Sequence, residues 1–198
     1  MAGSFNANVL KVAQSEIDAI GKENVDVFCI GKKARDYFKK RDYNIIESHT
    51  DFWNELNYSH AINIGAGVIS HFTHQHVEEI HVVYNEFVNV AAQYVRTEVL
   101  LPLVFEAEKD QTVGRLFEPN KEDIVKSLIP RHLNIQMWKY LLESYASEHA
   151  ARMLAMENAT DNAQEMIKDL TLQFNKVRQA TITTEMLEIV SGAEALQN

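Results

Sequence analysis

Apolar residues along the first hundred positions alternate between helical and strand-like spacing. The pattern predicts a helix over 10–20 that Gly21 ends. The run 25–30 is β-branched and aromatic and predicts a buried strand. A short basic helix is predicted next, over 32–40. Three more strands are predicted after it, over 43–46, 80–84 and 94–101. Strands separated by helical stretches favour an α/β fold with a Rossmann-like, partly parallel sheet, which we assign to residues 1–119.

From residue 120 onward the pattern is helical. Residues 119–123 contain a proline, an asparagine and two acidic side chains, which are signals of a helix start. Pro130 is expected to kink this helix or to restart it. Residues 131–190 contain neither proline nor glycine, and they predict a helix of about 90 Å at 1.5 Å per residue. Such a helix is longer than those of globular domains. We therefore assign residues 120–198 to a long C-terminal helix whose far end leaves the α/β body.

This helix carries an apolar seam whose members are separated by four and three residues in turn. They are Leu142, Ala146, His149, Met153, Met156, Thr160, Ala163, Ile167, Leu170, Phe174 and Val177. That heptad pattern is typical of a coiled coil, and it needs a partner helix. Nothing else in the sequence is long enough to pair with it, so the pattern predicts a partner from another chain or from a removed segment. A hairpin within the run is disfavoured because no turn residue interrupts it.

Composition narrows the functional classes. The 198 residues are 46% hydrophobic and carry a formal net charge of -9, so nucleic acid is not an expected partner, because phosphate backbones repel an acidic chain. The single Cys29 excludes an internal disulfide, and its apolar strand favours a core position over a nucleophile. No apolar run approaches the roughly 20 residues that span a bilayer. The first residues show neither a basic region nor an apolar core, so no signal peptide is expected.

A glycine-containing run offers one alternative function. Gly65 and Gly67 begin like a dinucleotide fingerprint, and Glu86 follows at a suitable distance. Ser70 occupies the place of the third glycine, however, and no convincing strand precedes the run. A helix over 58–74 with small residues inside it is therefore the favoured interpretation. A nucleotide-binding α/β enzyme remains the runner-up function, and a coiled-coil scaffold without a motor is a third.

Histidines and carboxylates gather between residues 71 and 81. The candidate metal ligands are His71, His74, His76, His81, Glu78 and Glu79. No cysteine or H-E-x-x-H run fixes a ligand geometry, so a histidine-rich helix end is favoured over a metal site. We expect no metal and no cofactor. Lys168, Lys176 and Arg178 place positive charge on the far part of the helix, as a solvated face or as contacts to an acidic partner.

The C-terminal third resembles the gamma subunit of F-type ATP synthases. Residues 150–163 and 175–185 are similar to two hallmark segments of that family, and its C-terminal signature is met by Ile182, Thr183, Glu185, Glu188, Gly192 and Ala193. Weaker similarity extends through the whole chain and includes residues 3–6 and 116–119. Family members begin with a long helix and a first strand ahead of the segment that 3–6 resembles. The resemblance therefore implies that the chain is truncated at its N-terminus and that the absent helix is the partner of the seam.

The resemblance implies a function as a central rotor shaft. In the family, two antiparallel helices form a coiled coil inside a ring of alpha and beta subunits, and the α/β domain lies against the epsilon subunit and the membrane c-ring. The shaft couples proton flow to conformational change in the catalytic beta subunits and is not itself catalytic. The implied location is peripheral, on the cytoplasmic face of an energy-transducing membrane of bacterial type.

Matching positions imply two sets of shaft contacts. Polar contacts with beta subunits are implied for Arg152, Arg178, Gln179, Thr183 and Glu185. An apolar bearing surface that can turn within the ring is implied for Ile182, Met186, Ile189 and Val190. Apolar contacts are non-directional, so they hold at many angles. For these four apolar residues, ordinary coiled-coil packing is an equally favoured interpretation.

Overall fold

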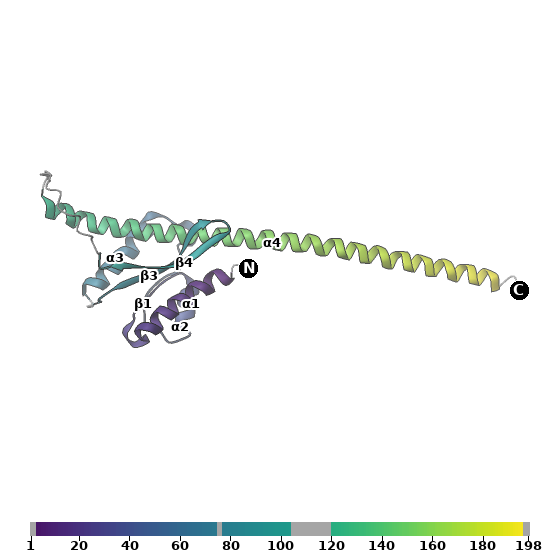
Figure 1. The fold of residues 1–198 in the computed structure, drawn as a ribbon, viewed down its shortest axis with the longest axis horizontal. Helices are drawn as coiled ribbons and strands as arrows, with labels where there is room; N and C mark the ends of the chain where they lie inside the picture. Colours follow the sequence, from purple (N-terminus) through teal and green to yellow (C-terminus); the bar gives the residue numbers. More distant parts are fainter. Residues whose placement is uncertain (1–2, 75–76, 104–119, 196–198) are drawn as a thin grey trace. The chain divides into compact units, whose positions relative to one another are not determined.

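The computed structural model describes residues 3–74, 77–103 and 120–195. Contacts divide the chain into two units, residues 1–152 and residues 153–198, and each unit is described by itself. The helices are α1 (Gly3–Ile20), α2 (Lys32–Lys39), α3 (Tyr58–His74) and α4 (Lys121–Ala195), and the strands are β1 (Val27–Ile30), β2 (Ile45–His49), β3 (Ile80–Asn89) and β4 (Ala92–Leu101) (Figure 1). Two short 3-10 turns cover Lys22–Asn24 and Trp53–Glu55.

The strands form two pairs of different direction. β1 and β2 are parallel, with Val27 opposite Ile45 and Ile30 opposite His49. β3 and β4 form an antiparallel hairpin. Within the described residues, the two pairs are not joined by strand hydrogen bonds. The predicted α/β class with a partly parallel sheet and a long C-terminal helix is confirmed.

Several strand boundaries differ from the prediction, and two of the differences have local reasons. β2 begins at Ile45 rather than at Tyr43, because the Tyr43 amide donates to the Phe38 carbonyl 3.2 Å away and so belongs to the turn that ends α2. Asp42 has a φ of 57° in that turn. β3 continues to Asn89, whose side-chain oxygen accepts hydrogen bonds from the Ala91 and Ala92 amides and closes the hairpin.

The first unit has two apolar cores. The larger one joins α3, β3, β4 and the first part of α4, and its most buried members include Ala61, Ile64, Tyr84, Leu133, Met137 and Leu141. The smaller one joins α1, α2 and β1 through Leu10, Ile17, Val27, Cys29 and Phe38. The helical spacing of Leu133, Met137, Tyr140 and Leu141 turns one face of α4 inward, which anchors the helix to the α/β body.

Helix α4 is continuous through Pro130, so of the two predicted outcomes, a kink or a restart, the restart does not occur. A proline inside a helix removes one backbone hydrogen bond and crowds the preceding turn. Here Ile129 and Leu133, on either side of it, both pack against the larger core. That packing offsets the lost bond and holds the helix together. The predicted domain boundary at residue 120 stays a prediction. The contacts divide the chain into two compact units after Arg152.

Candidate functional surfaces

The glycine run lies inside helix α3 and does not form a nucleotide loop. A Cβ on Gly65 would lie 2.5 Å from Asn134 Oδ1 on α4, and a Cβ on Gly67 would lie 3.0 Å from Glu47 Oε2 on β2. The glycines therefore allow α3 to approach its neighbours closely. A dinucleotide site needs such glycines in the turn between a strand and a helix. The alternative prediction of a Gly65/Gly67 loop is wrong, and the helical interpretation is confirmed.

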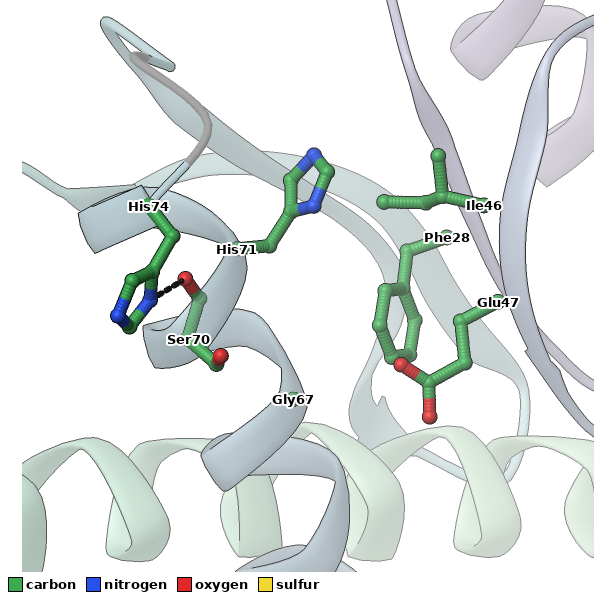
Figure 2. A pocket seen from close by; sticks show the side chains of 7 residues that line it. All are labelled: Phe28, Ile46, Glu47, Gly67, Ser70, His71 and His74. Atoms are coloured by element: carbon green, nitrogen blue, oxygen red, sulfur yellow. Dashed lines mark hydrogen bonds between the residues drawn. The ribbon is translucent and has the colours of Figure 1, made fainter.

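A small cavity lies beside this helix, between it and the β1–β2 pair (Figure 2). Its volume is about 230 Å³, and its lining is Phe28, Ile46, Glu47, Gly67, Ser70, His71 and His74. Ligand pockets are usually about 300–1,000 Å³, so this one is small. The Glu47 carboxylate in the lining would repel a diphosphate, and it lies 2.9 Å from His49 Nε2. These properties do not suit a nucleotide.

The histidines take separate partners. His71 Nε2 lies 3.2 Å from Asp26 Oδ2, and His81 Nε2 lies 2.9 Å from Glu79 Oε2. His74 Nδ1 donates to the Ser70 carbonyl of its own helix at 2.8 Å (Figure 2). His76 lies outside the described residues. In the part of the chain that the structure describes, no three ligand-type side chains converge as a metal site would require.

Two further candidates have structural roles. Cys29 is 1% exposed in β1, and burial raises the pKa of its thiol to about 11, against a weaker opposing effect of Arg35. A thiol that stays protonated is a poor nucleophile, so the predicted core position is confirmed. Glu86, the acidic residue that follows the glycine run, pairs across the hairpin with Arg96, whose Nε lies 2.7 Å from Glu86 Oε2.

The second unit presents its apolar residues to solvent. Every residue from 157 to 193 is exposed except half-buried Asn175. The large seam residues are accordingly open: Met153, Met156, Ile167, Leu170, Phe174 and Val177 are 50–66% exposed. No described residue of this unit covers them. Leu142, the first member of the seam, belongs to the first unit and is 42% exposed.

The seam extends further toward the N-terminus than its predicted start at Leu142. Leu128 and Ile135 precede Leu142 at spacings of seven, and they are 52% and 50% exposed. At 100° per residue they lie on the same face of α4 as Leu142, about opposite Leu133 and Tyr140, which are buried. The heptad spacing was the signal that could have identified them. The first part of α4 therefore has one apolar face in the core and a second apolar face exposed.

The residues predicted as shaft contacts, apart from Arg152, gather on one side of the second unit. At 100° per residue, the positions from Arg178 to Val190 in the two sets fall within an arc of about 160°. Arg178 and Glu185 lie at one edge, the apolar Ile182, Met186 and Ile189 lie toward the middle, and Thr183 lies at the other edge. The apolar members are strongly exposed, from 49% at Ile182 to 73% at Ile189. This surface is therefore amphipathic and open to a partner.

The polar members differ in their own hydrogen bonds. Thr183 Oγ1 donates to the Gln179 carbonyl at 2.8 Å, which satisfies the hydroxyl within the helix. Arg152 lies in the first unit and pairs with Glu148 one turn earlier. Among the described residues, neither Arg178 nor Glu185 forms an ion pair. Their charges are the ones most available to another molecule.

Comparison with known proteins decides the family. A family model described as ATP synthase matches residues 1–196. The ATP synthase gamma chain of Chlorobium phaeobacteroides is 40% identical over 206 residues, which cover 100% of this chain and 70% of the relative. The chain belongs to the ATP synthase gamma chain family. The predicted resemblance is confirmed, and membership supports the assignment of a non-catalytic subunit over a nucleotide-binding enzyme.

Solved structures of ATP synthase rotors share the fold. The rotor of the Euglena gracilis mitochondrial ATP synthase, in rotational state 1, matches with a TM-score of 0.64 and 21% identity over 91% of this chain and 70% of that chain. A second structure from the same organism, of OSCP, F1 and the c-ring in rotational state 3, matches with a TM-score of 0.66 and 21% identity over 98% of this chain and 68% of that chain. No helix among the described residues combines the length and apolar character needed to cross a membrane.

Proposed function

We propose that this chain is the central rotor shaft of a rotary F-type ATP synthase and couples proton flow through the membrane ring to conformational change in the beta subunits. Family membership supports this role. The observation that carries it is the open, amphipathic surface of the second unit. A rigid helix whose exposed face differs around its circumference contacts each surrounding subunit differently, and differential contact shifts conformational populations.

The seam supports a coiled coil as the form of the shaft. Large apolar side chains at 50–66% exposure from Met153 to Val177 leave much apolar area in water. Full burial of each such side chain contributes roughly 1.5–3 kcal/mol. A second helix laid along the seam would bury this area, as heptad positions require. The exposed Leu128 and Ile135 extend the proposed contact along the first part of α4.

The proposed contacts divide by chemistry. Arg152, Arg178, Gln179, Thr183 and Glu185 are the polar contacts with beta subunits, and Ile182, Met186, Ile189 and Val190 are the apolar bearing. Arg178 and Glu185 are the strongest of the polar candidates because no described ion pair occupies them. Arg152 must exchange its pairing with Glu148 for a new partner, so we assign it a smaller contribution.

The proposed assembly includes further partners at the α/β body. The alpha and beta subunits surround the shaft, and the epsilon subunit and the c-ring contact the first unit. The second Euglena structure is of a complex that includes F1 and the c-ring, which fits this arrangement. The chain would then lie peripherally on the cytoplasmic face of an energy-transducing membrane of bacterial type.

A rotation assay tests the proposal. The full-length protein, with Cys29→Ala and with Lys33→Cys at an exposed position of α2, carries a particle on the new cysteine and is assembled with alpha and beta subunits. We expect the particle to turn in one direction when ATP is added, and to stop when ATP is removed. Failure to assemble with alpha and beta, or an assembled complex that hydrolyses ATP while the particle is still, contradicts the rotor role.

A further inference from the structure

Helix α2 carries a strongly positive face on an otherwise acidic chain. Residues 32–41 contain six lysines and arginines and one carboxylate, Asp36. They contribute a net charge of +5, so the rest of the chain carries −14 of the total of −9. α2 packs into the smaller core with α1 and β1, whereas the first part of α4 packs into the larger core. The positive face therefore belongs to the α/β body and lies outside the proposed shaft surfaces.

Helical spacing places the cations of α2 on one side and its apolar residues on the other. At 100° per residue, the five lysines and arginines from 32 to 40 fall within an arc of about 160°. Ala34 and Phe38 lie opposite the middle of that arc, and Phe38 is 3% exposed in the smaller core. Packing of the apolar side therefore turns the positive side to solvent. Its four exposed lysines are Lys32, Lys33, Lys39 and Lys40.

The chain neutralises little of this charge. The one carboxylate of the face, Asp36, pairs with Arg35, whose Nη2 lies 3.0 Å from Asp36 Oδ1. Within the described ranges, none of the four lysines forms an ion pair. Like charges three or four residues apart on a helix repel each other. The face is therefore left with a surplus of positive charge that another molecule can neutralise.

The stability of α2 does not explain the positions of Lys32 and Lys33. Both lie in the first turn of the helix, and that turn contains no acidic residue. The N-terminal end of a helix carries a partial positive charge, which favours carboxylates there and disfavours cations. The same dipole favours Lys39 and Lys40 at the other end. Half of the exposed lysines thus oppose helix stability, which indicates a function beyond it.

Two further cations are held in position where α2 ends. Arg41 Cζ lies 3.7 Å from the centre of the Tyr37 ring, and Arg41 Nη1 donates to the Tyr37 carbonyl at 3.3 Å. Lys22 Nζ donates to the Arg41 carbonyl at 2.7 Å and lies 4.8 Å from the centre of the Tyr43 ring. These contacts fix both side chains before a partner binds, which lowers the entropic cost of binding.

We propose that this face binds an acidic segment of a partner protein through the six cations Lys22, Lys32, Lys33, Lys39, Lys40 and Arg41. The four lysines form two rows, and the members of each row are seven residues, or about 10 Å, apart along the axis. A segment whose carboxylates recur at that interval pairs with both rows. The inference rests on the proposed function in one respect, because the partner is sought among the subunits that contact the α/β body.

A membrane is the less favoured occupant of this face. The apolar side of α2 is packed in the smaller core, so the helix offers no apolar side chain for insertion into lipid. The rest of the chain, at −14, is repelled by anionic headgroups. An acidic protein segment requires neither insertion nor approach of the whole chain to an extended anionic surface.

Zero-length cross-linking tests the proposal on the full-length protein, isolated from its cells with the subunits that it binds. A carbodiimide joins a lysine amine to a carboxylate in direct contact, and mass spectrometry locates both ends of the link. We expect the four α2 lysines to link to carboxylates of one acidic segment in one partner subunit. Lys126, an exposed lysine of α4, is the internal control and should not link to that segment.

Charge variants identify the physical cause of the links. Lys39→Gln with Lys40→Gln should lower the yield of links from Lys32 and Lys33 about ten-fold, because a field of matched charge raises the local concentration of its partner. Lys39→Arg with Lys40→Arg keeps the charge and should keep the yield. An equal yield in the two double variants would overturn the proposal.

Two other outcomes would also overturn it. One is that the α2 lysines form no links, or form links scattered over several subunits at the yield of Lys126. If alpha and beta subunits are nevertheless present in the isolated complex, the rotor role stands and only the binding face is lost. The other is that the full-length chain sediments with phosphatidylglycerol vesicles but not with phosphatidylcholine vesicles, that the glutamine pair abolishes this, and that no protein links form. The face would then bind a membrane.

Discussion

Helix α4 contains two regions with the same secondary structure and opposite surroundings. In residues 121–152, Leu133, Met137 and Leu141 are 2–3% exposed and belong to the core of the first unit. In residues 153–193, equally apolar side chains such as Leu172 and Phe174 are 66–67% exposed. One unbroken helix therefore serves as a core element in one unit and as an open surface in the other.

The two regions show that the periodicity of apolar residues and their burial are separate properties. Both regions have apolar residues at helical spacing, and a pattern of that kind predicts a face rather than a partner. In the first region the α/β body covers one face, while Leu128 and Ile135 remain open on the opposite face. In the second region no described residue covers any face. Exposed apolar surface of this extent marks an interaction site.

The largest contrast between the regions should appear when the same substitution is made in each. Leu141→Ala removes a side chain that is 2% exposed and leaves a cavity, at an expected cost of about 2–5 kcal/mol in the free energy of unfolding. Leu172→Ala, at 67% exposure and off the seam, should change it by less than about 0.5 kcal/mol. Denaturant titration measures both. Equal effects would mean that Leu172 is covered by a partner within the chain.

The second prediction concerns the chain by itself in solution. With its seam open, it should self-associate or fray along the second unit, because burial of each large apolar side chain contributes roughly 1.5–3 kcal/mol. Leu170→Glu with Phe174→Glu should suppress association seen by light scattering, whereas Leu172→Glu, off the seam, should not. A monomer with strongly protected amides from Met153 to Val177 would contradict this prediction, since the helix would then have a partner within the chain.

Sequence reasoning succeeded where local signals decide the structure. The absence of glycine and proline from 131 to 190 predicted the long helix, and β-branched runs predicted β1 and β4. The heptad positions define an apolar line along this helix, because their spacing is a property of the helix alone, and the pairing of that line with a second helix stays a prediction. The polar shaft contacts came from similarity to a family rather than from chemistry, and they remain predictions.

Sequence reasoning failed where residues far apart in the chain decide the structure. The restart at Pro130 did not occur because packing of Ile129 and Leu133 depends on strands and helices elsewhere in the chain. Gly65 resembled a glycine of a dinucleotide fingerprint because the sequence alone does not show that Asn134 lies against it. The hydrogen bonds that Tyr84 and Tyr140 donate to Glu98 require β3, β4 and α4 to converge, which spacing alone does not encode.

Arg178 and Gln179 test the function of the exposed region of α4. In the full-length assembled protein, Arg178→Ala with Gln179→Ala should impair ATP-driven turnover more than assembly, because charge-assisted contacts contribute about 1.5–3 kcal/mol. Arg131→Ala, an exposed arginine in the first unit, serves as the control and should leave turnover unchanged. Hydrolysis and synthesis rates are the measurements. Unchanged rates in the double variant would remove both residues from the set of shaft contacts.

The smallest effects should come from two glycines of opposite surroundings. Alanine is favoured over glycine in a helix interior by about 1 kcal/mol, so propensity alone would stabilise both α3 and α4. Gly192 has no atoms within 4 Å of a new Cβ, and Gly192→Ala should show that gain as slower hydrogen exchange near the end of α4. A Cβ at Gly65 would lie 2.5 Å from Asn134 Oδ1, so either the Asn134 side chain must move or α3 must shift. Overpacking costs about 1–3 kcal/mol, so Gly65→Ala should lower the melting temperature despite its propensity gain. If Gly65→Ala raises the melting temperature instead, α3 does not approach α4 closely.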